Sequence, residues 1–362
     1  MKPLNILLAC TLTATTSAIA HADFTYQETT QITGGSVVSL MKFAGAFSKQ
    51  ARQAGEPIVS TVAVKGNRMM RANKDRTEII DLDAGTITVI DHVKKQYTTM
   101  TFEQMRQQME AAMAKAKAEQ SKQRQQPQSN QPENVDVKFN IKVRNTGASK
   151  DVAGLNTNES ILTMTLDATD KTSGQTGSLA ITNDMYLAPD IPGYDEVREF
   201  YKRYAQKMGT VMSGAINAQT MALMQQPAAG KGMADMAEEM SKLKGIPVLQ
   251  IMRMGTTADG TPLPAASEAP IPAGPPPPSA GDVAKQSASS ALMNSIPFGG
   301  FGKKKKQDDP PPAANSGASA QPTAAVLVES NTQMASFSQA SVDASQFNPP
   351  AGYKQVEPKQ ID

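Results

Sequence analysis

The residues best suited to chemistry are few in this chain. His21 and His92 are its only histidines, and Cys10 is its only cysteine. A histidine can act as a general base or bind a metal, but a zinc site made of histidine and cysteine needs several such ligands. His92 stands between Asp91 and Lys94 in a predicted hairpin turn. The pattern therefore favours a turn residue without a catalytic or metal-binding role.

Three aspartates, Asp81, Asp83 and Asp91, flank one predicted hairpin. Paired carboxylates can perform acid–base chemistry or bind calcium. Asp83, however, stands where a turn-forming residue is expected, and no calcium-loop spacing surrounds it. The sequence also contains no G-x-S-x-G elbow, phosphate-binding loop or His-Glu-x-x-His motif. Because nucleophiles, bases and metal ligands are so scarce, we predict a protein that is not an enzyme and uses no metal or cofactor.

Methionine is the most distinctive residue type, with 21 copies in the chain. Several are spaced three or four residues apart on predicted helices, and methionine surfaces adapt to varied apolar partners. One interpretation is a helical lid over an apolar groove; the other is ordinary packing of helices on a sheet, the commoner role of such stripes. The lid candidates are Met105, Met109, Met208, Met212, Met221 and Met224.

A short basic and aromatic stretch follows residue 296. It contains Phe298, Phe301, Lys303, Lys304, Lys305 and Lys306. Lysines beside an anionic membrane surface each contribute about 1 kcal/mol of binding. The stretch is thus a candidate for peripheral membrane contact, with a solvated charge run in a disordered loop as the alternative.

The first 22 residues read as an export signal. A positive start is followed by an apolar or small run over residues 4–19, and Ala20-His21-Ala22 matches an A-x-A cleavage site. Cys10 is preceded by too little apolar sequence for a lipoprotein cleavage box. Cleavage after Ala22 would remove Cys10 and His21, so the mature chain must gain stability from a packed core without disulfides. We expect a periplasmic or secreted protein.

Charge and hydropathy exclude other classes. The formal net charge is only +2, which does not suggest a nucleic-acid partner. After the signal, no apolar run is long enough to span a bilayer.

The remaining pattern predicts an α+β fold built on an antiparallel sheet. Short β-rich runs are joined by tight turns such as Asn73-Lys74-Asp75 and Asp83-Ala84-Gly85, which only antiparallel neighbours permit. Strands are predicted at residues 24–32, 59–71, 77–82, 86–91, 96–100, 135–144, 161–168, 178–188, 247–254 and 325–338. Helices are predicted within residues 36–52, 101–119, 190–224 and 233–243, with a linker at 120–134.

Residues 257–323 are rich in proline, alanine and glycine, yet apolar sequence returns after them. We predict that the strand at 325–338 pairs with the strand at 247–254, so the Pro-rich stretch is a disordered insertion in a hairpin. Loop closure depends only logarithmically on length, so such an insertion costs little stability. Residues 347–356 would then fasten the chain to the domain, which comprises 23–256 and 324–358.

Several stretches together resemble a family of exported bacterial proteins with a domain of unknown function and a PAGYK-type ending. They include GNRMMRANKDRTEIIDLDAGTITVIDHVKKQYTTM, KDVAGLNTNESILTMTL, IPGYDEVREFYKRYAQKM, KGIPVLQI, FGGFGKKKK and SVDASQFNPPAGYKQV. That family is distantly similar to the LolA/LolB half-barrels. The resemblance implies a curved antiparallel sheet, with helices on one face, whose concave side holds acyl chains.

Two functional hypotheses follow. The first is a non-catalytic cell-envelope binding protein with an apolar groove for lipid or a lipidated partner. The second is a protein-interaction module that acts through its Pro-rich, Lys-bearing loop. Deleting the loop separates them, because groove binding should survive the deletion.

Overall fold

The structure is a computed structural model that describes residues 23–38, 55–123, 135–170, 176–215, 235–257, 260–271 and 324–358. Side chains are not described for residues 113, 116–123, 135–137, 170, 176 and 211–215 within these ranges. The predicted signal peptide, most of the predicted helix at 36–52 and most of the Pro-rich stretch lie outside the described residues.

One twelve-stranded sheet dominates the described chain. Its strands are β1 (Phe24–Gly34), β2 (Ile58–Lys65), β3 (Arg68–Ala72), β4 (Arg76–Asp81), β5 (Thr86–Asp91), β6 (Gln96–Thr101), β7 (Val135–Val152), β8 (Leu155–Asp170), β9 (Thr176–Ala188), β10 (Ile246–Thr257), β11 (Ala324–Ser338) and β12 (Lys354–Gln355). Their spatial order is β12-β6-β5-β4-β3-β2-β1-β11-β10-β9-β8-β7. The predicted meander is confirmed over β2–β6.

The predicted return of the chain after the Pro-rich stretch is also confirmed. β10 and β11 pair antiparallel, with Met252 opposite Ser330. β11 then pairs with β1, so Thr332 lies opposite Thr30. The first strand of the fold therefore sits at the centre of the sheet, between β2 and β11.

One pair departs from the expected antiparallel sheet. β12 runs parallel to β6, with Lys354 opposite Gln96. The strand is only two residues long and follows a loop rather than a tight turn, so its direction is not constrained by a hairpin. The sheet is therefore mixed, although its other neighbouring pairs are antiparallel.

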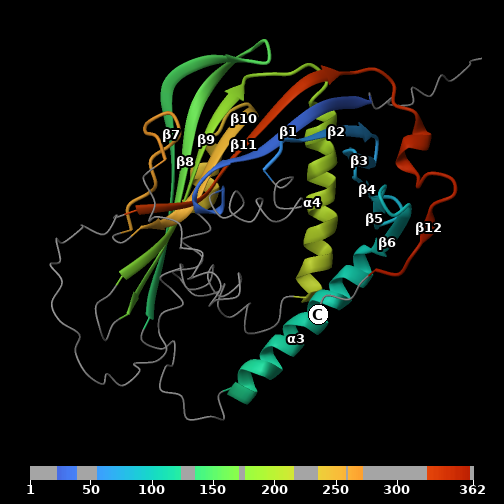
Figure 1. Ribbon diagram of the computed structural model, residues 1–362, viewed down its shortest axis with the longest axis horizontal. Helices are drawn as coiled ribbons and strands as arrows, with labels where there is room; N and C mark the ends of the chain where they lie inside the picture. The colour runs from blue at the N-terminus through green and yellow to red at the C-terminus, as the bar shows by residue number, and fades with distance from the viewer. Residues whose placement is uncertain are drawn as a thin grey trace, which may run out of the picture.

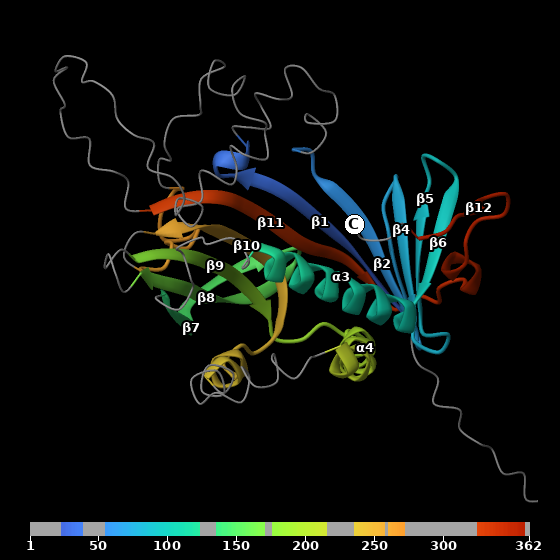
Figure 2. The ribbon, with the colours of Figure 1, turned by 90° about the horizontal axis from the view of Figure 1, so that it is seen from below.

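The sheet is curved, and two long helices lie within the curve (Figure 1). They are α3 (Phe102–Gln123) and α4 (Asp195–Ala215). Figure 2 shows α3 crossing below the strands and α4 nearly end-on, both on the same side of the sheet. A shorter helical segment covers residues 235–241. The predicted curved sheet with helices on one face is thus observed.

Local chemistry fixes where both long helices lie. α3 begins with a capping box, in which the Gln104 N–H donates to Thr101 Oγ1 at 3.0 Å and the Thr101 N–H donates to Gln104 Oε1 at 2.8 Å. α4 is held against the turns of the meander. Arg203 Nη2 donates to the Gly66 carbonyl at 3.0 Å, and Lys207 donates to the Leu82 carbonyl.

The main core lies between these helices and the concave face. Phe24 and Tyr26 of β1 contact Tyr194 and Phe337, with ring centroids 5.8–6.4 Å apart. Phe200 of α4 is fully buried in the same cluster. The core spans β1–β4 and also includes buried residues of β9–β11, namely Ala188, Val248 and Met334.

The convex face of the meander is covered by a second segment, which we call the C-terminal clasp (residues 339–358). Phe347 is buried among Met70, Ile79 and Ile90. Tyr353 packs against the same cluster, and the Val356 N–H donates to the Tyr97 carbonyl at 2.9 Å. The prediction that this segment fastens the chain to the domain is confirmed.

Residues 260–271 form a cover on the convex face of the other half, and we call them the outer strap. Leu263 packs with Ala180 and Val326 in a small buried cluster. These residues belong to the range expected to be a disordered insertion from residue 257. The apolar Leu263 and the buried Ala265 hold this part on the sheet, so the packed chain extends further than the composition indicated.

β7 and β8 are also longer than expected. They form one hairpin closed by Ala153 and Gly154, both with positive φ, as a two-residue turn of this kind requires. A register shift between Asn145 and Ser149 accommodates Gly147, whose φ is +80°. Residues predicted as a Gly-rich turn after 144 are therefore a bulged continuation of the strand.

Candidate functional site

The predicted lid methionines divide into three groups. Met105 and Met208 pack against the main core, and Met109 is half-buried on α3. Met212 belongs to α4, but its side chain is not among those described. Met221 and Met224 lie outside the described residues, as do the candidates for membrane contact at 298–306. For Met105 and Met208, the contacts match ordinary packing of helices on a sheet.

The candidate site is the part of the concave face that lies beyond the core and that α3 and α4 do not cover. Side chains alternate between the two faces of a strand, and cross-strand partners share a face. Ile32 therefore faces the same side as Phe24 and Tyr26, whose face packs on α4. Its cross-strand partners carry this face across the sheet as far as β7.

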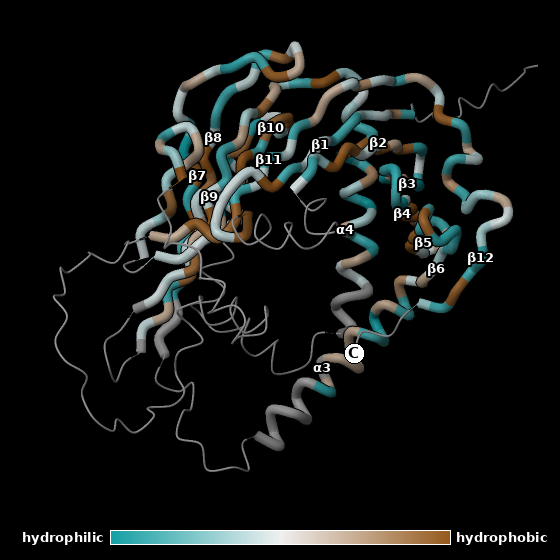
Figure 3. Tube along the Cα trace, in the orientation of Figure 1, coloured by the Kyte–Doolittle hydropathy of each residue, from teal (hydrophilic) through white to brown (hydrophobic). Residues whose placement is uncertain are grey.

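Three cross-strand rows of side chains, which we call the apolar rows, occupy this face. The row nearest the helices runs from Ile32 through Ser330, Met252, Asn183 and Leu162 to Val143. The middle row contains Val328, Met254, Ile181, Met164 and Ile141, and the outer row contains Leu179, Leu166 and Phe139. Figure 3 shows hydrophobic stretches, in brown, along β7–β10.

The rows remain partly open to solvent. Phe139, Leu166 and Met252 are 37%, 39% and 38% exposed, which is high for large apolar side chains. No charged residue stands in the three rows. A solvent-accessible apolar patch that extends over several strands marks a binding surface more often than it marks chance exposure.

A row of polar side chains, Thr30, Thr332 and Gln250, lies between the apolar rows and the helix-covered core. Asn183 Nδ2 donates to Gln250 Oε1 at 3.1 Å, and Thr30 and Thr332 share a hydrogen bond of 3.2 Å. Asn183 Oδ1, however, is buried and has no hydrogen-bond partner among the described residues. The concave face thus has a packed half under the helices and a less covered apolar half over β7–β11.

Sequence reasoning identified only part of this surface. The alternation of Phe139 and Ile141 with polar residues was recognised as a half-buried strand. Met164, Met252 and Met254 were not predicted as surface residues because they lack the helical spacing of the other methionines. The available signal was the alternation in ILTMTL and LQIMRM, where every second residue faces one side.

The polar candidates have turn and linking roles. Asp81 and Asp91 accept backbone N–H groups of Ala84 and Lys94, both at 2.8 Å. His92 bonds on both sides, with Nε2 2.8 Å from Thr77 Oγ1 and Nδ1 3.2 Å from the Tyr353 hydroxyl. His92 therefore joins the meander to the C-terminal clasp, a link that the sequence did not reveal.

No three metal-binding side chains gather among the described residues, and none of the described helices is long and apolar enough to span a membrane. No protein family and no curated protein matches the chain. Fold and site together define an open, curved, mixed β-sheet with two helices and an apolar surface on its concave side.

Proposed function

We propose that this chain is a non-catalytic binding protein of the cell envelope, whose apolar rows bind the acyl chain of a lipid or of a lipidated partner. The proposal includes export through the signal at residues 1–22, a periplasmic or secreted location, and a distant relationship to the LolA/LolB half-barrels. Its main support is the set of three apolar rows beside the helix-covered core.

The dimensions and composition of the rows suit a long flexible apolar ligand. Five strands, β7–β11, carry the middle row, and at the usual strand spacing this is about 19 Å across. An extended acyl chain of a membrane lipid has a similar length. Methionine side chains at Met164, Met252 and Met254 can adjust to different chain shapes. The lack of charge in the rows favours an aliphatic ligand over a polar one.

The first experiment is native mass spectrometry of the mature protein purified from its own compartment, followed by organic extraction. A bound species with the mass of an acyl-bearing lipid is the expected result. Titration with a fluorescent fatty acid then measures affinity. An apo mass together with no fatty-acid binding would overturn the proposal.

A pair of variants locates the binding surface. Met252→Gln places a polar amide in the apolar rows, and we expect fatty-acid binding to weaken roughly fivefold because apolar contact is lost. Val59→Gln is the control: Val59 of β2 is 51% exposed, but it pairs with Thr29 and so faces the opposite side of the sheet from Ile32. Equal affinities of the two variants would place the ligand elsewhere.

A second candidate function is protein interaction through the Pro-rich stretch. One observation favours it. Ile271 and Ala324, which flank residues 272–323, both pack against the cluster of Leu263 and Val326. The two residues that flank the stretch thus lie at one place on the convex face, opposite the apolar rows.

The two functions respond differently to a deletion. Because the outer strap is packed, the deletion should begin after Ile271 and end before Ala324, with a short Gly/Ser linker. Fatty-acid binding is expected to persist in this variant. If the deleted variant binds fatty acid but no longer cross-links to an envelope partner of the full-length chain, the chain has the interaction function as well as lipid binding.

A further inference from the structure

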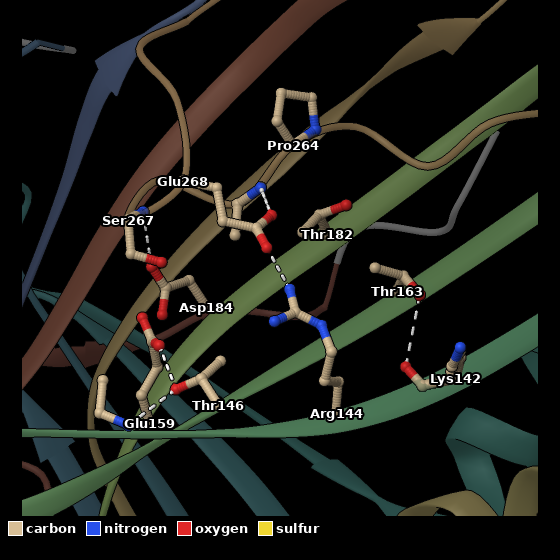
Figure 4. A network of polar contacts seen from close by, with 12 residues as sticks. Lys142, Arg144, Thr146, Glu159, Thr163, Thr182, Asp184, Pro264, Ser267 and Glu268 are labelled. Atoms are coloured by element: carbon tan, nitrogen blue, oxygen red, sulfur yellow. Dashed lines mark hydrogen bonds and ion pairs between the residues drawn. The ribbon is translucent and has the colours of Figure 1, made fainter.

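The outer strap is attached to the sheet by a buried polar network, and Figure 4 shows the part of it around Asp184, Glu159 and Ser267. Thr182 Oγ1 donates to the Leu263 carbonyl at 2.7 Å. The buried Arg253 donates through Nη1 to the carbonyls of Pro264, Ala265 and Ala269 at 2.8–3.1 Å. Polar attachment of this kind depends on every buried group having a partner.

One half of the network is balanced in charge. Arg253 Nε donates to Glu329 Oε2 at 2.8 Å, and both side chains are largely buried. Glu329 Oε1 also accepts from Thr33 Oγ1 at 2.8 Å. The opposite charges of this ion pair balance each other, so this half of the network needs no further charged partner.

The other half contains two buried carboxyl groups. Asp184 is 0% exposed and Glu159 is 5% exposed, and Figure 4 shows the two groups pointing toward each other. The Ser267 N–H of the strap donates to Asp184 Oδ2 at 3.0 Å. Glu159 accepts from the Tyr186 hydroxyl at 3.2 Å and from Thr146. Three of the four carboxyl oxygens therefore have donors.

The fourth oxygen, Asp184 Oδ1, is buried and has no hydrogen-bond donor among the described residues. No ion pair in the described part of the chain involves Asp184 or Glu159. Two adjacent buried carboxylates without a cation are strongly disfavoured, and a single shared proton resolves the conflict. A proton on Oδ1 would convert the unpaired acceptor into a donor toward Glu159.

We propose that Asp184 and Glu159 share one proton, and that this proton latches the outer strap onto the convex face, so that the strap detaches as the pH rises. The latch goes beyond the proposed lipid binding and does not depend on it. It would control the base of the Pro-rich stretch, since the strap leads directly into residue 272.

The titration behaviour of the pair agrees with this arrangement. Burial, followed by the neighbouring Glu159 charge, raises the pKa of Asp184 above its ordinary value. Burial alone would also raise the pKa of Glu159, but hydrogen bonds from Ser267, Thr146 and Tyr186 lower it overall. The shared proton is therefore held by Asp184, while Glu159 is the ionised member.

The direction of the pH effect follows from linkage. A group whose pKa is higher with the strap attached than with it detached favours attachment at low pH. That contribution is lost as the pH rises through the pKa of the attached state. Because one proton is involved, the ratio of detached to attached strap can rise at most tenfold per pH unit.

Other charged or titratable groups surround the pair. β7 contributes Arg144 and Lys150, β9 contributes Tyr186, the strap contributes Glu268, β10 contributes Arg253 and β11 contributes Glu329. Arg144 is paired with Glu268, and Lys150 lies 5.0 Å from the Tyr186 ring centroid. Burial raises the pKa of Tyr186 to about 12. That hydroxyl therefore remains a donor throughout the range tested below.

Amide hydrogen exchange of residues 260–271, measured from pH 5 to pH 9 and corrected for the intrinsic exchange rate, tests the latch. The amide of Ser267 reports on it directly, since it donates to Asp184. In the wild type we expect protection to fall by up to tenfold per pH unit at high pH. Asp184→Asn cannot ionise, so its strap protection should not vary with pH.

A second variant and a control complete the test. Glu159→Gln removes the like charge and lowers the pKa of Asp184 in the attached state, so the fall in strap protection should level off at a lower pH and be smaller in total than in the wild type. Asp151→Asn makes the same chemical change in the β7–β8 turn, where Asp151 accepts from the Gly154 N–H, and should behave like the wild type. If Asp184→Asn does not fold, Glu159→Gln decides the outcome. Strap protection independent of pH in the wild type, or an unshifted response in Glu159→Gln, would overturn the latch.

Discussion

At the scale of single residues, Asp23 does more than begin the first strand. Its carboxylate accepts from Lys65 Nζ at 2.6 Å and from the Val342 N–H at 2.7 Å. It therefore ties β1 to β2 and to the C-terminal clasp. Burial alone would raise the pKa of Asp23, but these two hydrogen bonds outweigh burial and hold the pKa below its ordinary value.

Asp23→Asn should destabilise the fold. We expect the free energy of unfolding in urea to fall by about 2 kcal/mol at pH 7, since charged hydrogen bonds are lost. A depressed pKa contributes stability above the unfolded value of about 3.9, and the contribution disappears as the pH falls through the folded pKa. The difference between wild type and variant should thus shrink below about pH 4.

The matched control is Asp195→Asn, which removes an exposed ion pair with Arg198 on α4. Exposed pairs contribute little, so the change should stay below about 0.5 kcal/mol. Equal effects of the two substitutions would contradict the structural role of Asp23.

At the scale of elements, much of the sheet could be predicted because its turns carry strong signals. Asp83-Ala84-Gly85 and the alternation in the flanking strands specify β4 and β5, and the observed register agrees. The pairing of β10 with β11 could be predicted because an apolar strand after the Pro-rich stretch needs a neighbouring strand to pair with. β12 could not be predicted, because two exposed residues after a loop carry no periodicity.

The elements that escaped prediction lack the alternation of a strand and the periodicity of a helix. Residues 145–150 resemble a turn, yet they continue β7 through a bulge, because their backbone pairs with β8. The outer strap resembles the start of a disordered stretch because its attachment relies on Arg253, Thr182 and Asp184, which lie far away in the sequence. Of the candidate site, strand alternation indicated Phe139 and Ile141, but cross-strand rows require a register that only the structure provides.

The C-terminal clasp is an element whose removal should be measurable. Phe347→Ala is expected to lower the free energy of unfolding by about 3 kcal/mol, because a buried aromatic ring is replaced by a cavity. The guanidinium of Arg68, 5.2 Å from the ring centroid, loses its aromatic partner as well. Urea denaturation monitored by circular dichroism provides the measurement.

Val93→Ala serves as the comparison for the clasp, because Val93 is 74% exposed and its truncation should change stability by less than about 0.5 kcal/mol. A Phe347→Ala variant as stable as Val93→Ala would mean that the clasp is not a stabilising part of the domain.

At the scale of the whole molecule, the two faces of the sheet are covered differently. Helices cover half of the concave face, whereas the clasp and the strap cover parts of the convex face. Residues 272–323 connect two packed points and were predicted to be an insertion. Their removal should therefore leave the fold intact.

We expect the deletion of residues 272–323 to raise the free energy of unfolding by up to about 2 kcal/mol, because a shorter connection loses less entropy on closure. Urea titration of the deleted and full-length chains measures the difference. A large loss of stability would show that this stretch takes part in the packed structure.

The pairing of β1 with β11 has a consequence for the order in which the protein forms. Thr30 and Thr332 are partners although almost the whole chain separates them, and contacts at such separation form slowly. The centre of the sheet cannot close until the last long strand has emerged from the ribosome. During synthesis the chain therefore stays open between β1 and β11, which is the state that the proposed export through a narrow channel would require.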